Sequence, residues 1–559
     1  MGALGLLLFE FGFPVPPDAQ FRILFAVRVT LWIIVTVQLL RSILDLDLLR
    51  ARWMTLRRVA GFAALFLLLA FEQPLLPRLA AAWGTFAIAG WDTLYLTTLH
   101  LVVLVALAKR ILHFNEFLAF ARISPRVILI SSYVGLIVAG TLLLKLPNAA
   151  TGELTWLDAL FTSTSAVCVT GLIVVDTATA FTPFGHGILM LLFQLGGLGL
   201  MTFTYFFVAI FGSGITIKDR ALLLEFLNEE YVGRVTGSLF AIVGMTLAFE
   251  LVGAVLLHAC VPGDWFVSLF HAVSAFCNAG FSVYSAGLQD PLTRSHLPFQ
   301  GVIMVLIIVG GLGFPVLKNL WDHLSSRSGA RGQRPLRLTL HTKLVLATTA
   351  LLVVGGALAI YAFEPKGAAG GGEAPAWMSA LFNSVTARTA GFNTVPIDAL
   401  LPSTVFAMIA LMFVGGSPAS TAGGIKTTTF AVALLNTLRI MKEPDGDLVA
   451  FRRKIPAVMA NRAFAVALLA LGWIAASTIL LAWAMPTHKP LDVAFEVVSA
   501  FSTVGLSRGI TAELPVSGKA IIMASMLVGR IGVLYIALGI LRKDRAASIG
   551  YPEGSLIIS

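Results

Sequence analysis

The stretch Cys168-Val169-Thr170-Gly171-Leu172, which reads CVTGL, lies between two long apolar segments of the chain. Three altered copies follow, and each ends in a glycine and a bulky apolar residue. They are Cys277-Asn278-Ala279-Gly280-Phe281, Arg388-Thr389-Ala390-Gly391-Phe392 and Ser502-Thr503-Val504-Gly505-Leu506. Successive glycines are 109, 111 and 114 residues apart. This nearly constant interval indicates an internal repeat, and we call the four copies the first to fourth glycine loops.

A second series of glycines repeats with the same phase. Each glycine loop is followed, 24 to 30 residues after its glycine, by a glycine-containing motif within an apolar segment. The four motifs are GGLG at 196–199, GGLG at 310–313, GGSP at 415–418 and GRIG at 529–532. Two matching series in one phase predict a fourfold duplication.

The composition predicts an integral membrane protein. Of the 559 residues, 58% are hydrophobic and only 12% are charged, whereas soluble domains carry roughly 25% charged residues. Many windows of 18 or more residues are almost free of charge, which is the length that a membrane-spanning helix needs. Because the alternating ten-residue segments of a β-barrel are absent, we expect an all-α polytopic fold.

Eleven apolar segments are long enough to be considered as spans. They fall at about 21–45, 59–76, 84–108, 127–147, 183–212, 237–260, 299–320, 341–363, 402–440 (interrupted), 462–485 and 517–541. The net charge of +10 comes from basic clusters in the loops between them, so the positive-inside rule explains it better than nucleic-acid binding does. An odd number of spans then predicts an outside N-terminus and a cytoplasmic C-terminus in the inner (plasma) membrane.

From residue 125 the chain has a repeating unit: a spanning helix, a segment of about a dozen residues, a glycine loop and a second spanning helix. A dozen residues rise only about halfway across the bilayer as a helix, which predicts re-entrant half-helices. The expected parts are an N-terminal extension with three spans (1–124), four pore repeats (125–222, 223–330, 331–445 and 446–545) and a cytoplasmic tail (546–559).

Four half-helices, each followed by a glycine loop, can close around an axis and direct carbonyl oxygens at a common centre. Such a ring replaces the hydration shell of a cation. Glycine permits the backbone angles that this requires, and the partially negative helix C-termini favour a cation. The sequence therefore predicts a cation-selective filter.

The four loops, together with the run GGSPASTAGGIKTTT at 415–429, resemble the Trk/Ktr/HKT superfamily of potassium transporters, in particular its TrkH- and KtrB-type membrane subunits. The resemblance covers about 125–541. It implies a pore of four non-identical repeats, a homodimer in the lipid membrane, and a separate cytosolic TrkA- or KtrA-like ring that carries the nucleotide. It implies no cofactor bound by this chain, with K⁺ as the transported ion. Three N-terminal spans exceed the eight-helix minimum of the superfamily.

In this superfamily, glycine at all four filter positions is associated with potassium and serine at the first with sodium, so Gly171 favours potassium. We expect the carbonyl oxygens of the residues before each glycine to bind the ion. The expected K⁺ filter is Val169, Thr170, Gly171, Asn278, Ala279, Gly280, Thr389, Ala390, Gly391, Thr503, Val504 and Gly505.

The interrupted span is the candidate gate. Glycine and proline between 415 and 424 break a helix, giving either a kink or turn or, as the resemblance implies, a mobile loop below the filter. Arg530 lies inside the last apolar segment, where it forms a salt bridge in the bundle or a positive barrier near the pore. The expected gate residues are Gly415, Gly416, Ser417, Gly423, Gly424, Lys426 and Arg530.

Two further charged residues are notable. Arg388 is expected to anchor the back of the third glycine loop, because an arginine facing the ions would repel them. Glu250 lies deep in an apolar segment, where a hydrogen bond to a neighbouring helix is more common than a role in transport or proton coupling.

Three alternatives to a potassium pore, working as a gated channel or ion-coupled transporter, remain. A sodium or mixed sodium/potassium transporter would share the same loops. A secondary transporter with inverted repeats is disfavoured, because all four units have one orientation. A membrane enzyme would need clustered polar ligands, and His258 and His271 belong to no ligand-spaced set, so we expect no enzymatic activity.

Overall fold

The computed structural model describes residues 12–13, 125–211, 235–328, 337–364, 375–443 and 446–533. The three predicted N-terminal spans, the predicted tail at 546–559 and most of the basic loops lie outside these residues. The chain divides into two compact units. The larger one comprises 124–144, 152–181 and 186–559, and it contains all four glycine loops.

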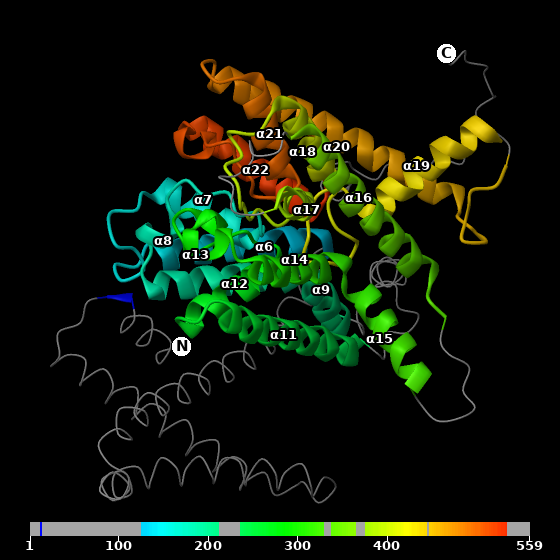
Figure 1. Ribbon diagram of the computed structural model, residues 1–559, viewed down its shortest axis with the longest axis horizontal. Coiled ribbons are helices and arrows are strands. Elements are labelled where there is room, and N and C mark those ends of the chain that lie inside the picture. Colours follow the sequence, from blue (N-terminus) through cyan, green and yellow to red (C-terminus); the bar gives the residue numbers. More distant parts are fainter. Residues whose placement is uncertain are drawn as a thin grey trace, which may run out of the picture. The chain divides into compact units, whose positions relative to one another are not determined.

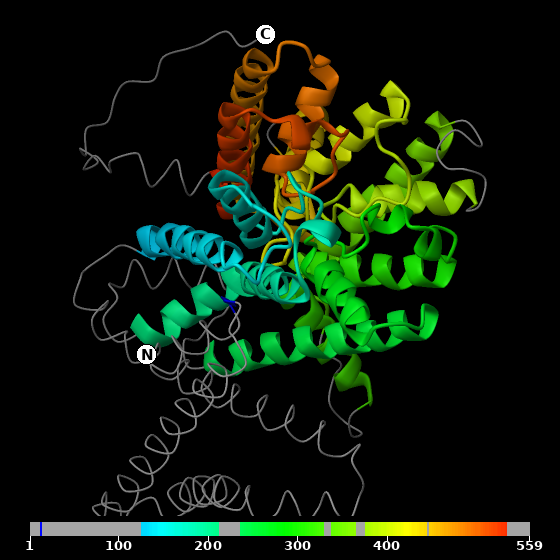
Figure 2. The same ribbon diagram turned by 90° about the vertical axis from the view of Figure 1, so that its left-hand side faces the viewer.

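Within the larger unit, one order of elements occurs four times: a long helix, a short helix, a glycine loop and another helix (Figure 1). Figure 2 shows these groups following one another around the unit in the order of the sequence colours, from cyan to red. The helices are α6 (Pro125–Leu144), α7 (Trp156–Val167) and α9 (Pro183–Phe211); α11 (Val235–Cys260), α12 (Trp265–Cys277) and α14 (Leu297–Leu312); α16 (Leu340–Phe363), α17 (Ala376–Thr386) and α18 (Pro402–Phe413); and α20 (Ala457–Ala484), α21 (Pro490–Phe501) and α22 (Val516–Ile531).

Smaller elements connect these helices. Short turns of helix follow three of the glycine loops, and a two-stranded antiparallel hairpin, in which Val449 pairs with Lys454, precedes α20. These elements are α8 (Thr177–Ala180), η2 (Gly287–Gln289), α13 (Pro291–Arg294), α15 (Phe314–Ser328), α19 (Thr427–Lys442), β1 (Val449–Ala450), β2 (Arg453–Lys454) and η3 (Ile510–Glu513).

The four short helices, α7, α12, α17 and α21, begin at local signals and end in the glycine loops. Thr155 caps α7 by accepting a hydrogen bond from the Asp158 amide at 3.1 Å, and Asp264 caps α12 in the same way. Prolines stand at the start of the other two, where the missing N–H costs nothing. With 11 to 13 residues each, they rise roughly 16–20 Å, too little to cross a bilayer.

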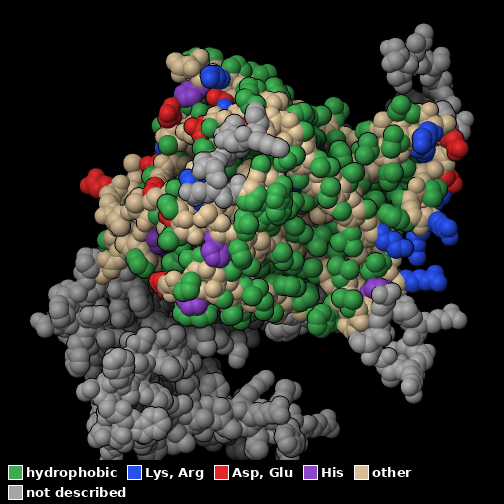
Figure 3. Space-filling model, viewed as in Figure 1, with side chains coloured by type: hydrophobic (Ala, Val, Ile, Leu, Met, Phe, Trp, Pro, Cys, Tyr) green, Lys and Arg blue, Asp and Glu red, His purple; other side chains and the backbone are tan. Residues whose placement is uncertain are grey.

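The short helices are the buried part of the fold, and the long helices are its apolar surface. Each short helix buries a phenylalanine completely: Phe161, Phe276, Phe382 and Phe495. By contrast, Leu251, Leu358 and Leu468 on the long helices are 60%, 65% and 73% exposed. Apolar side chains cover much of the face in Figure 3. Large exposed apolar surfaces of this kind fit contact with lipid.

Among the described residues, three helices are long and apolar enough to cross a membrane: Ala241–Cys260, Leu340–Phe363 and Ala457–Ala484. A fourth candidate is a bent pair, Leu297–Leu312 and Phe314–Ser325, whose axes differ by 99°. The span predicted at about 299–320 corresponds to this bent pair and is not a straight helix. The chain turns at Gly313, where φ is +87° and a Cβ atom would lie 2.7 Å from the Pro418 carbonyl oxygen.

The interruption in the 402–440 segment falls between Phe413 and Thr427, where α18 ends and α19 begins. A parallel bridge between Val414 and Ile425 closes the base of the intervening segment, the 414–426 loop. Most of its residues are buried. The loop is therefore an internal feature of the larger unit rather than a surface turn.

Candidate functional site

The four glycine loops share an unusual backbone conformation. In each, the second residue has a positive φ, at 57° for Val169, 58° for Asn278, 146° for Thr389 and 50° for Thr503. Each glycine also has a positive φ, between 71° and 94°. Left-handed conformations are costly for residues with a side chain. Three such residues at matching positions, with Thr389 deviating, show that the loops follow one path with a variation in the third.

The four glycines meet in a closed ring. A Cβ atom added to Gly171 would lie closer than 3.0 Å to the Ala279 carbonyl oxygen of the second loop. In the same way, a Cβ atom on Gly280 would overlap a carbonyl oxygen of the third loop, and one on Gly391 a carbonyl oxygen of the fourth. A Cβ atom on Gly505 would overlap the Thr170 carbonyl oxygen of the first loop. Each glycine thus lies against the carbonyl that precedes the next glycine. The filter residues predicted from the sequence are therefore brought together in space.

A hydroxyl group on the short helix supports each loop from behind. Ser165 and Ser499, both six residues before a loop glycine, accept hydrogen bonds from the Gly171 and Gly505 amides at 3.1 Å. Ser274 donates to the Phe281 carbonyl at 2.8 Å, and Thr386 donates to the Phe392 carbonyl at 2.7 Å. We did not identify these four residues from the sequence, although three of them lie six residues before a loop glycine.

The second glycine series has a packing role. A Cβ atom on Gly196, Gly310 or Gly529 would overlap a carbonyl oxygen at the end of the adjacent short helix, belonging to Val167, Phe276 and Phe501 respectively. These helices pack as closely as backbone allows. In the third copy, Gly415 instead lies against the Gly423 carbonyl within the 414–426 loop.

The 414–426 loop contacts the second and fourth glycine-loop regions. The Ser417 amide and hydroxyl both donate to the Gly311 carbonyl at 3.0 Å, and Thr421 Oγ1 donates to the Phe276 carbonyl at 3.1 Å. A Cβ atom on Gly423 would overlap the Thr503 side chain. The loop hydroxyls therefore bond to backbone carbonyls close to the second glycine loop.

Three cationic side chains hold this loop. Arg530, only 3% exposed, donates to the carbonyls of Thr421 and, at 2.6 Å, Gly196. Arg388 donates to the Gly415 carbonyl at 3.0 Å, and Lys426 to the Ala422 carbonyl at 2.7 Å. Among the described residues, Arg530 bonds to carbonyl oxygens and forms no salt bridge of the kind considered above.

Glu250 on α11 lies behind the second glycine loop. It accepts a hydrogen bond from Gln194 Nε2 at 3.1 Å, and Cys277 Sγ contacts Gln194 Oε1 at 3.2 Å and Glu250 Oε1 at 3.8 Å. The carboxyl group is thus bonded to a neighbouring helix, the commoner of the two roles considered for it. In the described part of the chain, no group of three or more His, Cys, Asp or Glu residues could hold a metal ion.

Apolar long helices around buried short helices define a helical membrane protein, in which four glycine loops bring backbone carbonyl oxygens together in a ring. Residues 98–546 match the model of the TrkH family, described as cation transport proteins. The chain is 37% identical over 453 residues to Ktr system potassium uptake protein B of Bacillus subtilis, covering 79% of this chain and 98% of that protein. It is 35% identical to potassium/sodium uptake protein NtpJ of Enterococcus hirae, covering 78% of this chain and 98% of that protein.

A crystal structure of the potassium transporter TrkH from Vibrio parahaemolyticus has the same fold, with a TM-score of 0.60 at 17% identity over 75% of this chain and 86% of that one. The chain belongs to the TrkH family of cation transport proteins. It is accordingly a membrane transport protein rather than an enzyme, as the sequence predicts.

Proposed function

We propose that this protein is the potassium-translocating membrane subunit of a Trk/Ktr-type uptake system. The relative from Bacillus subtilis is named a potassium uptake protein. The observation that carries the proposal is the closed ring in which Gly171, Gly280, Gly391 and Gly505 each lie against a carbonyl of the next loop. Carbonyl oxygens held in a ring substitute for the water around K⁺.

In this proposal, the filter ligands are the backbone carbonyl oxygens of each loop glycine and of the two residues before it. The short helices end at the loops, so their partial negative charges are directed there and favour a cation. The four repeats form a pseudo-symmetric pore, with eleven spans, an outside N-terminus and a cytoplasmic C-terminus in the plasma membrane.

The proposed gate is the loop at 415–424 with Arg530. Its support is the set of hydrogen bonds that Ser417, Thr421 and Arg530 make between the loop and the backbone beside the glycine loops. A loop held there obstructs the path beyond the filter, and its hydrogen bonds must break for ions to pass.

The proposed assembly is a homodimer with a separate cytosolic ring of TrkA or KtrA type, which carries the nucleotide. Its support is family membership, together with large apolar faces on the long helices that suit a second copy or lipid. A second function, mixed sodium/potassium transport, is favoured by the name of the Enterococcus hirae relative.

The test is ion uptake in a host that lacks its own potassium uptake systems. The intact protein should restore K⁺ uptake with discrimination against Na⁺. Gly171→Ser should reduce that discrimination, because a side chain there meets the Ala279 carbonyl and the φ of +87° disfavours it. Gly187→Ser on α9 is the control, since a Cβ atom there contacts nothing within 4 Å.

If the intact protein restores no K⁺ uptake while present in the membrane, the proposal fails. Equal Na⁺ and K⁺ uptake by the intact protein would favour the mixed transporter instead. An unchanged preference in Gly171→Ser would remove the first glycine loop from the filter.

A further inference from the structure

Two of the four glycine loops carry a second hydrogen-bonded brace, located after the glycine. In the second copy, the short-helix residue nine positions before the glycine is His271, and the residue two positions after it is Ser282. In the fourth copy, the same two positions hold Glu496 and Ser507. Both pairs are hydrogen-bonded, so the same geometry arises from different chemistry.

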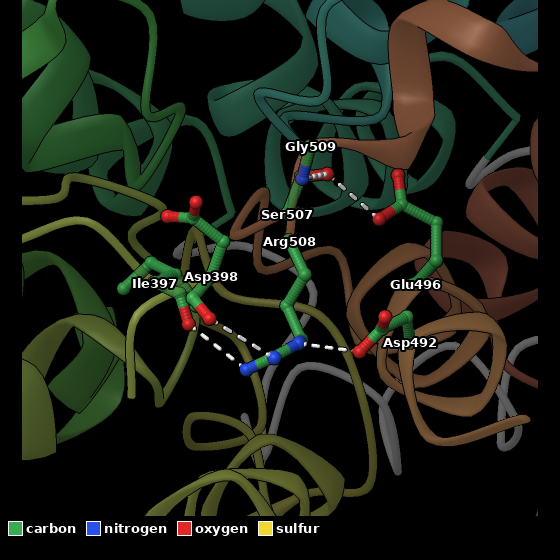
Figure 4. A network of polar contacts seen from close by, with 7 residues as sticks. All are labelled: Ile397, Asp398, Asp492, Glu496, Ser507, Arg508 and Gly509. Carbon is green, nitrogen blue, oxygen red and sulfur yellow. Dashed lines mark hydrogen bonds and ion pairs between the residues drawn. The ribbon is translucent and has the colours of Figure 1, made fainter. Parts of the chain in front are cut away.

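The fourth-copy pair is built around a buried carboxylate. Glu496 is fully buried on α21, and its Oε2 accepts a hydrogen bond from Ser507 Oγ at 2.8 Å (Figure 4). Its other oxygen accepts from the Thr511 hydroxyl. A buried carboxylate requires such partners, because an unpaired charge or polar atom without water is costly. The segment from Ser507 to Thr511 is thereby fixed to the short helix.

An arginine fixes the same segment on its other side. Arg508 Nε bonds to Asp492 Oδ1 at 2.5 Å, one turn before Glu496 on α21. Its other nitrogens donate to the carbonyls of Ile397, at 2.9 Å, and Asp398, at 3.2 Å, in the segment after the third glycine loop. Figure 4 shows Arg508 extended between these two groups. The residues after Gly505 are thus held by side chains of one helix and by the neighbouring copy.

The second-copy pair uses a buried imidazole. His271 Nδ1 lies 2.8 Å from the Val267 carbonyl, an acceptor, so Nδ1 carries the proton. In the neutral ring Nε2 then accepts from Ser282 Oγ, 2.9 Å away. Ser282 Oγ itself accepts from the Tyr284 amide at 3.0 Å, and the Tyr284 ring stacks on His271 with centroids 4.9 Å apart.

The first and third copies lack this pair. Their equivalent positions hold Thr162 with Ile173, and Phe382 with Asn393. Because the glycine ring runs from the first loop to the second, third and fourth and back, the two braced loops face each other across it. The brace therefore supports one diagonal of the ring.

We propose that Ser282 with His271, and Ser507 with Glu496, are positioning pairs that hold the ends of two opposite glycine loops and so set the discrimination between K⁺ and Na⁺. The pairs act through the loop backbone, two residues beyond Gly280 and Gly505, rather than by touching the ion. This inference rests on the proposed potassium function.

The test compares threonine and valine at each serine. Ser507→Thr and Ser507→Val have side chains of nearly the same shape and differ in the hydroxyl, and Ser282→Thr and Ser282→Val form a second such set. Ser163→Thr and Ser163→Val are the matched control, because the Ser163 hydroxyl is buried on α7 but donates to the Ile137 carbonyl of α6 at 2.7 Å rather than supporting a glycine loop. The readouts are KM and Vmax for K⁺ uptake and the inhibition of that uptake by Na⁺, at matched membrane abundance.

Both valine variants at 282 and 507 should raise the KM for K⁺ and weaken discrimination against Na⁺ by about three- to tenfold relative to their threonine partners. Vmax per molecule should change less than KM. Ser163→Thr and Ser163→Val should differ neither in the KM for K⁺ nor in discrimination against Na⁺. If the Ser282→Thr or Ser507→Thr protein does not accumulate in the membrane, the alanine variant at that position is compared with the unchanged protein instead.

Equal KM and equal Na⁺ inhibition in the threonine and valine partners at both positions would overturn the proposal. An equal difference in KM and Na⁺ inhibition between Ser163→Thr and Ser163→Val would also overturn the proposal. The effect would then follow from the loss of any buried hydroxyl group. Failure of the proposed function is distinct, because the unchanged protein would then transport no K⁺ at all.

Discussion

Arg530 on α22 donates a hydrogen bond from its guanidinium group to the backbone carbonyl oxygen of Thr421 in the 414–426 loop. The same guanidinium reaches the Gly196 carbonyl of α9, while the Thr421 hydroxyl reaches the Phe276 carbonyl at the end of α12. One point of the loop is therefore tied to three helical groups that are far apart in the sequence. These ties hold the loop in the position seen here.

Arg530→Gln should raise K⁺ uptake about tenfold, because a hydrogen bond to a charged group contributes roughly 1.5–3 kcal/mol and its loss frees the loop. Uptake by the potassium-deficient host, corrected for membrane abundance, measures the effect. Arg453→Gln, in the exposed hairpin, is the control. Lower uptake by a normally abundant Arg530→Gln protein would contradict a role for this arginine in closing the path.

Deleting residues 418–421 should also increase uptake. The deletion removes the Thr421 bonds to both Phe276 and Arg530 and shortens the loop beneath the fourth glycine loop. Ion flux through purified protein in liposomes separates a change in the path from a change in expression. Unchanged or reduced flux in a properly folded deletion protein would argue that the loop is a structural turn.

Gly310→Ala should destabilise the protein, whereas Gly301→Ala on the same helix should not. A Cβ atom at Gly310 overlaps the Phe276 carbonyl, but one at Gly301 meets nothing within 4 Å. Overpacking of a rigid contact costs about 1–3 kcal/mol, while alanine in a helix is better than glycine by up to about 1 kcal/mol. The midpoint of thermal unfolding in detergent should fall only for Gly310→Ala, and an equal response of the two variants would refute the close-packing argument.

The ion pair between Asp158 and Lys519, at 2.6 Å, joins the first turns of α7 and α22 and so links the first group of helices to the last. Burial raises the pKa of Asp158, but the hydrogen bonds from Lys519 and Thr155 and the Lys519 charge outweigh it, so the pKa lies below its usual 3.8. The carboxylate therefore stabilises the folded state above that pH, and its contribution is lost only as the pH falls through the lowered pKa.

Asp158→Asn and Lys519→Met should each lower the unfolding midpoint, and the double variant should lose little more than either, because the partners act together. The expected loss is about 1 kcal/mol for each single variant. It should be the same at about pH 5 and pH 8, both above the range in which Asp158 titrates. A loss that disappears between these two pH values would show that the pKa of Asp158 is raised rather than lowered.

The sequence was most informative where a backbone requirement repeats. Both glycine series were visible because only glycine fits against a carbonyl oxygen, at Gly171 beside Ala279 and at Gly310 beside Phe276. The residues that meet in the ring could be predicted on that basis, whereas the helical class followed from composition and the family from the resemblance of the loop motifs.

Features that depend on tertiary contacts were not predictable. The bend falls at Gly313 rather than at Gly310, Gly311 or Pro315 of the same run, and the Pro418 carbonyl oxygen beside Gly313 is more than 100 residues away in the sequence. The partners of Arg530 are backbone carbonyls, which no side-chain pattern reveals. The serine six residues before three of the loop glycines was readable from the sequence, but its meaning required the hydrogen bonds to the loops.

The ring of four glycines is encoded by a single chain, and its four sides differ. In a pore made of four identical subunits, one codon change alters every side at once. Here a substitution changes one quarter of the ring and leaves three intact, as with the brace present only at Ser282 and Ser507. In the proposed filter, a single substitution would therefore alter the carbonyl oxygens on one side of the ion path, while the other three sides keep their sequence.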